Sequence, residues 1–284
     1  MPELAVSLGA LIDEGTERLR GSGVSQPRRQ AIRIWTELGH GGPAEVFLGK
    51  EQPVDPAAAV RFQVAISRRA GGAPLPHVTG RSGFRRLNLV SDGRALIPRP
   101  ETEGLVDLLL QRVRTGRVAD IGTGSGCIAL SLALEGGYDE IMAIDRSADA
   151  LALARLNRDM TAGRVSLVQG DLCAPLGSGG FDALISNPPY LTVAEYSSLE
   201  SSVRDWEPAM ALVSGEDGMA ATTRLLDEGL DVVRPGGWLA LEVDCSRATA
   251  AATQASALGW TEVTVHMDLF GRERYLLAQR SDTR

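Results

Sequence analysis

The chain has 284 residues, of which 44% are apolar and 23% are charged, a composition typical of a globular protein and not of a disordered one. Its apolar stretches are much shorter than the roughly 20 residues that cross a bilayer. The N-terminal segment carries Glu3 and no basic leader, so we expect neither a membrane segment nor a secretory signal. The three cysteines and three histidines lie far apart, which argues against a disulfide framework and a zinc site. We therefore expect a cytoplasmic protein without a metal centre.

Charge is distributed unevenly along the chain. Residues 1–100 hold 13 arginines, one lysine and 9 acids, a net charge of +5, whereas residues 101–284 carry a net charge of −12. The segment 56–91 holds six arginines and no acid. Two interpretations remain open. The strip is either a solvated helix face in an arginine-rich protein, or a basic surface that meets an acidic partner.

The first 70 residues carry helix signals and no strand pattern. Apolar residues recur at helical spacing over 5–19. Ser25 and Asp55 can each cap a helix, because a proline follows in the first helical turn. We predict a small helical domain over residues 1–75 that recognises the substrate.

A linker is expected after the helical domain, at residues 76–98. Glycine and proline gather over 71–80, and two apolar-alternating runs follow on either side of Asp92-Gly93. An Asp-Gly pair between such runs is a hairpin signal. We therefore predict a two-stranded β-hairpin over 84–97.

From residue 99 to residue 284, strand patterns alternate with helix patterns. Strands are expected at 117–121, 140–145, 164–169, 181–186, 236–243, 261–266 and 272–278. This alternation predicts an α/β fold, a Rossmann-like parallel sheet with helices on both faces. The last two strands are joined by a short turn, so we expect them to pair antiparallel.

A glycine-rich turn follows the first strand of this sheet. It consists of Gly122, Thr123, Gly124, Ser125 and Gly126. Glycine lets a backbone approach a ligand closely. The spacing differs from the G-x-G-x-x-G of dinucleotide sites, and the chain has no phosphate-loop lysine, because Lys50 is its only lysine.

Acids follow the next two strands. Asp145 ends the second strand, where a carboxylate can accept hydrogen bonds from both ribose hydroxyls, and Asp171 and Leu172 follow the third, beside an expected adenine. Either acid alone could be a helix cap. Together with the glycine turn, they predict an adenosine pocket without a pyrophosphate. This pattern is typical of class I methyltransferases, which bind S-adenosyl-L-methionine.

The fourth strand runs directly into Asn187, Pro188, Pro189 and Tyr190. The amide oxygen of Asn187 and the carbonyl of Pro188 can accept hydrogen bonds from a planar NH₂ group, and Tyr190 offers a face for stacking. A side-chain carboxamide and the N6 of adenine both satisfy this chemistry. We predict that Asn187 is catalytic, that it also contacts the cofactor, and that the four residues bind the group to be methylated.

The sequence resembles the bacterial peptide chain release factor N5-glutamine methyltransferases over nearly its whole length. The matching positions are 68–74, Gly80, 96–103, 120–126, 128–130, Asp145, Gly170-Asp171, 186–190, 203–208, Ala211-Leu212, Gly215, Asp217-Gly218, Gly236-Gly237, Leu241-Glu242, Asp268 and Gly271-Arg272. The run Leu-Ile-Pro-Arg-Pro-Glu-Thr-Glu at 96–103 is highly characteristic. The sequence departs from the family at Ser202, at Leu172 and over 244–247.

The resemblance implies a methyl transfer from S-adenosyl-L-methionine to the glutamine side chain in the GGQ motif of release factors. It assigns 122–126, Asp145, Asp171 and Leu172 to the cofactor, and 187–190 to the glutamine carboxamide. It also implies an enzyme that works as a monomer, without a membrane or a stable nucleic-acid complex.

Three alternatives remain: glutamine methylation of a ribosomal protein, adenine-N6 methylation of nucleic acid, and a non-catalytic scaffold. The acidic catalytic half and the total of 13 aromatic residues argue against nucleic acid, whereas the basic strip favours it. An intact Asn187 and glycine turn argue against a scaffold.

Overall fold

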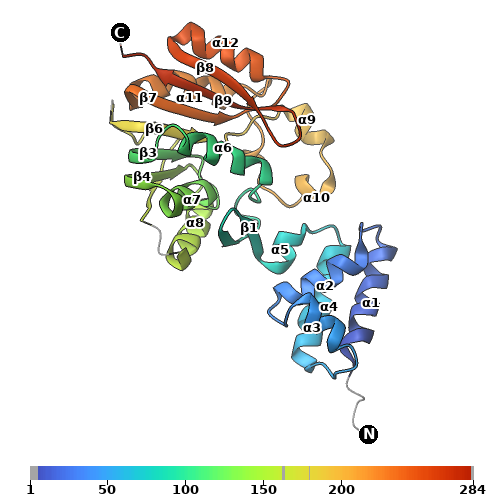
Figure 1. The fold of residues 1–284 in the computed structure, drawn as a ribbon. Helices are drawn as coiled ribbons and strands as arrows, with labels where there is room; N and C mark the ends of the chain where they lie inside the picture. Colours follow the sequence, from blue (N-terminus) through green and yellow to red (C-terminus); the bar gives the residue numbers. More distant parts are fainter. Residues whose placement is uncertain (1–5, 162–163, 179, 283–284) are drawn as a thin grey trace. The chain divides into compact units, whose positions relative to one another are not determined.

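The computed structural model describes residues 6–161, 164–178 and 180–282 (Figure 1). The chain divides into two compact units. A helical unit contains the chain up to Arg81 together with Ser201–Trp206, and an α/β unit contains Ser82–Glu200 and Glu207–Arg284.

The helical unit is built around one apolar core. Its helices are α1 (Leu8–Gly21), α2 (Pro27–Glu37), α3 (Pro43–Leu48), α4 (Pro56–Ala70), α5 (Leu75–Thr79) and the short α10 (Ser201–Arg204). Phe62 of α4 is fully buried and contacts Trp35 edge-on, with 5.8 Å between ring centroids. Gly15 of α1 permits this packing, because a Cβ there would meet the Phe62 ring at 2.9 Å.

Of the two expected helix caps, only Asp55 is confirmed. Its Oδ2 accepts a hydrogen bond from the Ala58 backbone at 2.9 Å. The prediction for Ser25 is wrong, since the residue before α2 is Gln26, which has a positive φ of 49° and makes no side-chain cap. Pro27 occupies the first turn of α2, so the helix begins one residue later than a Ser25 cap requires.

The α/β unit contains a two-stranded and a seven-stranded sheet. The strands are β1 (Arg81–Phe84), β2 (Leu87–Val90), β3 (Thr115–Ile121), β4 (Gly137–Asp145), β5 (Ser166–Gln169), β6 (Phe181–Ser186), β7 (Val233–Glu242), β8 (Trp260–Met267) and β9 (Glu273–Arg280). The larger sheet has the order β5-β4-β3-β6-β7-β9-β8. All its neighbours pair parallel except β9, which is antiparallel to both β7 and β8. The α/β fold class and the antiparallel final pair are therefore confirmed.

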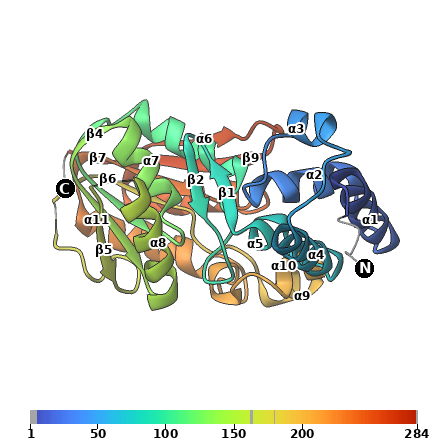
Figure 2. The same ribbon diagram turned by 90° about the horizontal axis from the view of Figure 1, so that it is seen from below.

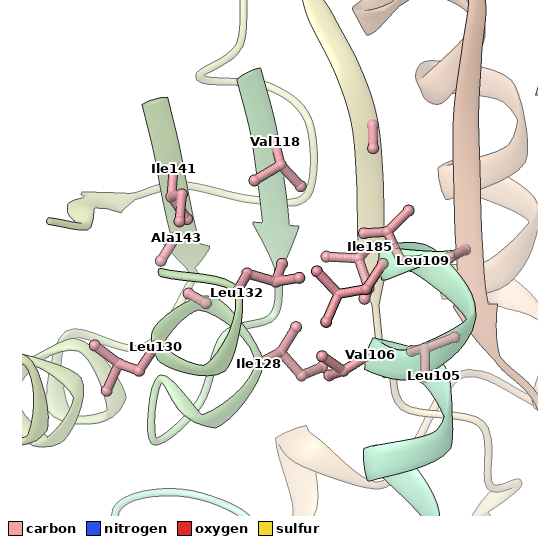
Figure 3. Packing of buried hydrophobic residues seen from close by; sticks show 14 of the residues in the cluster. Leu105, Val106, Leu109, Val118, Ile128, Leu130, Leu132, Ile141, Ala143 and Ile185 are labelled. Atoms are coloured by element: carbon pink, nitrogen blue, oxygen red, sulfur yellow. The ribbon is translucent and has the colours of Figure 1, made fainter. Parts of the chain in front are cut away.

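Helices cover both faces of the seven-stranded sheet (Figure 1). They are α6 (Pro100–Leu110), α7 (Cys127–Glu135), α8 (Ala148–Thr161), α11 (Ala220–Val232) and α12 (Ala248–Leu258). Alternate residues of β3 serve the two faces: Val118 packs with α6 and α7, as Figure 3 shows, and Ala119 packs with α11 and α12. The inner strand β3 is thus apolar on both sides, as a strand covered on both faces requires.

The position of the hairpin differs from the prediction. The turn lies at Arg85-Arg86, between β1 and β2, and not at Asp92-Gly93. Arg85 has a φ of 51°, the left-handed geometry that a two-residue turn needs. Its guanidinium donates to Glu135 at 2.7 Å from both Nε and Nη2, and to Asp107 at 2.7 Å, so ion pairs stabilise a turn whose residue type is unfavourable.

The strand β2 belongs to the α/β unit and lies beside α7 and α8 (Figure 2). The side chain of Asn157 bonds both backbone groups of Val90, accepting from its nitrogen at 2.7 Å and donating to its oxygen at 3.2 Å. Asn157 also donates to the Ser125 carbonyl at 2.9 Å. One buried amide therefore links the small sheet to the glycine turn.

The basic strip at 56–91 is only partly available to a partner. Arg85 is already paired with Glu135 and Asp107. Arg69 donates to Gln30 at 2.7 Å and to the Ala73 carbonyl at 3.1 Å. Arg61, Arg68 and Arg86 are exposed. Among the described residues, no helix is long and apolar enough to span a bilayer.

Candidate functional site

A cavity of about 360 Å³ lies at the carboxyl edge of the seven-stranded sheet, within the α/β unit. The residues that follow β3, β4, β5 and β6 form part of its wall. Among the residues predicted from sequence to bind cofactor, those that line it are Gly122, Thr123, Gly124, Ser125, Asp145, Asp171, Leu172 and Asn187. Gly126 instead is the N-cap of α7, where a Cβ would lie 3.3 Å from Leu130 and 3.4 Å from Ala154.

The glycine turn needs its glycines for backbone geometry. Gly122 and Gly124 have φ values of 71° and 56°, which L side chains rarely adopt. The turn is held from behind by the buried Asp120, whose Oδ2 accepts from Thr123 Oγ1 at 2.6 Å and from the Ala129 nitrogen at 3.1 Å. Burial raises the pKa of Asp120 to about 7. The result is a rigid backbone surface open toward the cavity.

Asp145 stands at the end of β4, across from the glycine turn. Its Oδ2 accepts from the Gly124 nitrogen and its Oδ1 from the Ser147 nitrogen, both at 2.8 Å. Burial raises the pKa of Asp145, and these backbone donors oppose that shift. A carboxylate has room for further donors at each oxygen, so Asp145 can hold the turn and still accept from a ribose.

Asp171 and Leu172 form the wall after β5. Asp171 is exposed and pairs with Arg224 at 2.9 Å. Leu172 has a φ of 46°, unusual for a branched side chain and worth on the order of 1 kcal/mol of strain. Such strain at a cavity wall indicates that the position of the Leu172 backbone matters to the site.

Asn187 is held by a chain of side chains that the sequence analysis did not identify. Its Nδ2 donates to Thr102 Oγ1 at 3.0 Å, and Thr102 Oγ1 donates to Glu242 Oε2 at 2.7 Å. Both Thr102 and Glu242 are buried. Because the one hydroxyl proton of Thr102 goes to Glu242, the threonine must accept from Asn187, which leaves the Asn187 oxygen free to accept from a ligand.

Glu242, at the end of β7, has a carboxyl group that is almost completely buried. Burial raises its pKa to about 7, while the hydrogen bond from Thr102 and the charge of Arg274 oppose the rise. Glu242 accepts from the Thr102 hydroxyl, and this bond leaves the threonine oxygen to accept from Asn187.

The remaining residues after β6 occupy different environments. Pro189 lines the cavity, whereas Pro188 is buried. Tyr190 donates its backbone N–H to the Leu212 carbonyl at 3.2 Å, and burial raises the pKa of its hydroxyl to about 12. Tyr190 therefore stays protonated at neutral pH.

The segment before α6 forms a wall that the sequence analysis did not assign to the site. Residues 94–99 and Thr102 line the cavity. The buried Glu207 connects this segment to the wall at 208–215, since it accepts from the Ile97 nitrogen at 2.9 Å and from Arg99 at 2.6 Å. The run at 96–103 was distinctive in sequence, but spacing along the chain gave no sign that it faces the cavity.

The departure from the family at 244–247 has a clear structural effect. Arg247 donates to both carboxylate oxygens of Glu195, in α9 (Val193–Ser198), and to the Asp217 carbonyl at 2.7 Å. Gly218 leaves room for it, because a Cβ there would meet Arg247 Nε at 2.7 Å. Arg247 thus ties α9 to the turn before α11. Ser202, another of the three departures, lies in α10 of the helical unit.

The donor set fits an adenosine-containing sulfonium cofactor. The glycine turn supplies close backbone approach, Asp145 supplies a carboxylate acceptor, and Leu172 supplies an apolar wall. Asn187 presents a fixed amide oxygen on the same cavity. The arrangement can bind a nucleoside and hold a planar NH₂ group beside it. Among the described residues, no group of acids, cysteines and histidines could hold a metal ion.

Comparison with known proteins identifies two family models in the chain. Residues 10–80 match the PrmC N-terminal domain, and residues 100–201 match the methyltransferase small domain. The release factor glutamine methyltransferase of Deinococcus radiodurans is 40% identical over 97% of this chain and 99% of its own length. The protein of the same name from Moorella thermoacetica is 38% identical over 98% of this chain and 100% of its own.

Solved structures agree at the level of the fold. A methyltransferase from Pyrococcus furiosus matches with a TM-score of 0.53 and 21% identity, over 69% of this chain and 89% of its own. The ribosomal protein L11 methylase of Lactobacillus delbrueckii matches with a TM-score of 0.50 and 19% identity, over 70% of this chain and 95% of its own. At these identities, both matches show that the chain has the class I methyltransferase fold, and they show nothing about its substrate.

Proposed function

Since this chain belongs to the release factor glutamine methyltransferases, we propose that it transfers a methyl group from S-adenosyl-L-methionine to the side-chain nitrogen of the glutamine in the GGQ motif of release factors. The observation that carries the proposal is the fixed amide of Asn187 on the wall of an adenosine-sized cavity. Its free oxygen is the acceptor that a carboxamide NH₂ group requires.

The cofactor supplies an electrophilic methyl group on a positively charged sulfur. We assign its adenosine to the glycine turn at 122–125, with Asp145 on the ribose and Asp171 and Leu172 beside the adenine. We assign Asn187, which lines the same cavity, to contact with both cofactor and target. None of these contacts needs a metal ligand or a general base.

The chemical task of the chain is to align a weak nucleophile. The nitrogen of a carboxamide is not basic, because its lone pair is delocalised into the carbonyl. The Asn187 oxygen and the Pro188 carbonyl would accept hydrogen bonds from the two N–H groups of the carboxamide, so that the nitrogen lone pair can turn toward the methyl group. Alignment of this kind contributes up to about 7–11 kcal/mol of the barrier in favourable cases. Fixed acceptors also stabilise the positive charge that develops on nitrogen.

We assign recognition of the whole release factor to the helical domain, residues 1–75, as a proposal of its own. Arg61 and Arg68 are exposed there and offer charge to an acidic partner. The net charge of −12 over residues 101–284 disfavours a stable nucleic-acid complex. We further propose that the enzyme acts as a monomer in the cytoplasm.

Transfer of labelled methyl groups tests this function. Purified protein and labelled S-adenosyl-L-methionine would be incubated in parallel with release factor, with ribosomal protein and with DNA. We expect label in release factor alone, and none when the glutamine of its GGQ motif is replaced by asparagine. Label in ribosomal protein or DNA at an equal or higher rate would overturn the assignment of substrate.

A further inference from the structure

The turn between β8 and β9 carries apolar side chains where most turns are polar. Leu269 is 97% exposed and Phe270 is 69% exposed, and Met267 beside them is 65% exposed. Isolated exposed apolar residues are common on protein surfaces and need no explanation. Leu269 and Phe270 are adjacent at the tip of the turn, and Met267 lies beside them. Together they form a small continuous apolar surface whose exposure to water is unfavourable.

This turn is held rigid by the residue before its tip. Asp268 is buried, and its Oδ1 accepts from the nitrogens of Phe270 at 2.8 Å and Arg272 at 3.0 Å. Its Oδ2 accepts from the side chains of Arg272 at 3.1 Å and Arg274 at 3.5 Å. The backbone adds a bond from the Gly271 nitrogen to the Asp268 carbonyl at 3.0 Å. The apolar tip is therefore presented in one fixed conformation.

The tip lies at the carboxyl edge of the seven-stranded sheet, the same edge that carries the cavity. Tyr275 of β9 pairs with Glu242, the last residue of β7, so the chain from Glu273 back to Asp268 extends beyond the carboxyl end of β7. Arg274 connects the turn to the site, because it contacts Asp268 and its charge lowers the pKa values of Glu242 and Tyr190 against the effect of burial. Arg274 therefore links the turn to Glu242 and Tyr190 on the proposed target side.

We propose that Leu269 and Phe270 form a docking point that binds an apolar patch of the release factor. This inference rests on the proposed function. A glutamine that reaches Asn187 must bring protein surface to this edge of the sheet, and a rigid aromatic-aliphatic pair binds such a surface with little loss of side-chain freedom. The apolar side chains are then exposed in the free enzyme because they are already in the conformation that binds the release factor.

The experiment replaces both side chains, as L269S together with F270S, and leaves Asp268 and the arginines unchanged. Steady-state transfer to whole release factor should show a KM about tenfold higher or more, as for a hot-spot pair, with kcat within about twofold. Affinity for S-adenosylhomocysteine, measured by calorimetry, should equal that of the wild type. A matched control is Leu134→Ser, a 53% exposed leucine near the end of α7, away from this edge, which should change none of these values.

Each other outcome has a definite meaning. An unchanged KM for release factor overturns the docking point, and so does a loss of cofactor affinity, which would make the turn part of the site's own scaffold. A changed sedimentation coefficient with unchanged KM would identify the tip as a contact between copies of this chain, and would equally overturn it. If the wild-type enzyme itself fails to label release factor, the proposed function is at fault and not this surface.

Discussion

The two sides of the cavity are built by different means. On the cofactor side, Asp145 contacts the Gly124 nitrogen, 21 positions earlier, at the ends of two adjacent strands. On the target side, Asn187 depends on Thr102, 85 positions away, and Thr102 depends on Glu242, 140 positions away. Backbone geometry shapes the first side, whereas buried side chains from α6 and β7 orient Asn187 on the second. Substitutions should therefore affect binding on one side and transfer on the other.

The largest effect is expected at Asn187, the end of the target-side chain. Asn187→Ala removes the acceptor and should lower the single-turnover rate on release factor about 10²- to 10³-fold, by analogy with the loss of one preorganised transition-state partner. Cofactor affinity should stay within about tenfold of the wild type, because it depends mainly on the other side. The rate is measured with saturating labelled cofactor. A near-normal rate would reduce Asn187 to a turn residue.

Asp145 should show the opposite pattern. Asp145→Ala removes a charged acceptor, so cofactor affinity should fall by about 1.5–3 kcal/mol, roughly 10- to 150-fold. The single-turnover rate at saturating cofactor should change little. Asp145→Asn removes the charge and leaves one acceptor oxygen for the two backbone N–H groups that Asp145 bonds, so its affinity should fall between those of the wild type and the alanine variant. Unchanged calorimetric affinity in the alanine variant would mean that Asp145 only holds the Gly124 turn.

Thr102 tests whether the orientation of Asn187 matters apart from its presence. Thr102→Val keeps the shape and removes the hydroxyl together with its bonds to Asn187 and Glu242. Loss of the bond that orients Asn187, about 1–1.5 kcal/mol, should slow single turnover about tenfold. Thr102→Ser retains the hydroxyl and should restore most of the rate. Cofactor affinity should be the same in both variants. Equal rates for valine and serine would show that Asn187 is oriented without Thr102.

The smallest effect concerns stability and the pH at which Glu242 ionises. Its pKa is raised in the fold from 4.5 to about 7, so the folded state keeps a proton that the unfolded state has released. The free energy of unfolding of the wild type, relative to Glu242→Gln, should therefore fall as pH rises from 4.5 to about 7, and be constant above and below. The slope should not exceed about 1.4 kcal/mol per pH unit.

Urea unfolding of both proteins across this pH range measures the difference. Taking the difference removes the contribution of Asp120, whose pKa is raised in the same direction and which is present in both proteins. If the difference in unfolding free energy between the two proteins does not vary with pH, Glu242 ionises with its ordinary pKa in the fold. Burial beside Thr102 would then not suppress its charge.

The sequence alone determined the α/β unit and the cofactor side of the cavity. Strand ends are readable from local periodicity, and in a parallel sheet the ends of successive strands meet at one edge. Gly124 and Asp145 could therefore be placed together without coordinates. The antiparallel pairing of β8 and β9 was predictable for a similar reason, because only a short turn separates them.

Only the tertiary structure decided which residues hold Asn187 on the target side and where the hairpin turns. Thr102 and Glu242 are ordinary residues in their own helix and strand, and their chemistry appears only when α6 and β7 bring them to Asn187. The turn of the hairpin lies at Arg85 and not at Asp92-Gly93, because Glu135 and Asp107, distant in sequence, stabilise it there. Local patterns report the preferences of neighbouring residues, whereas buried hydrogen bonds and ion pairs between distant segments gain their strength only once folding has removed them from water.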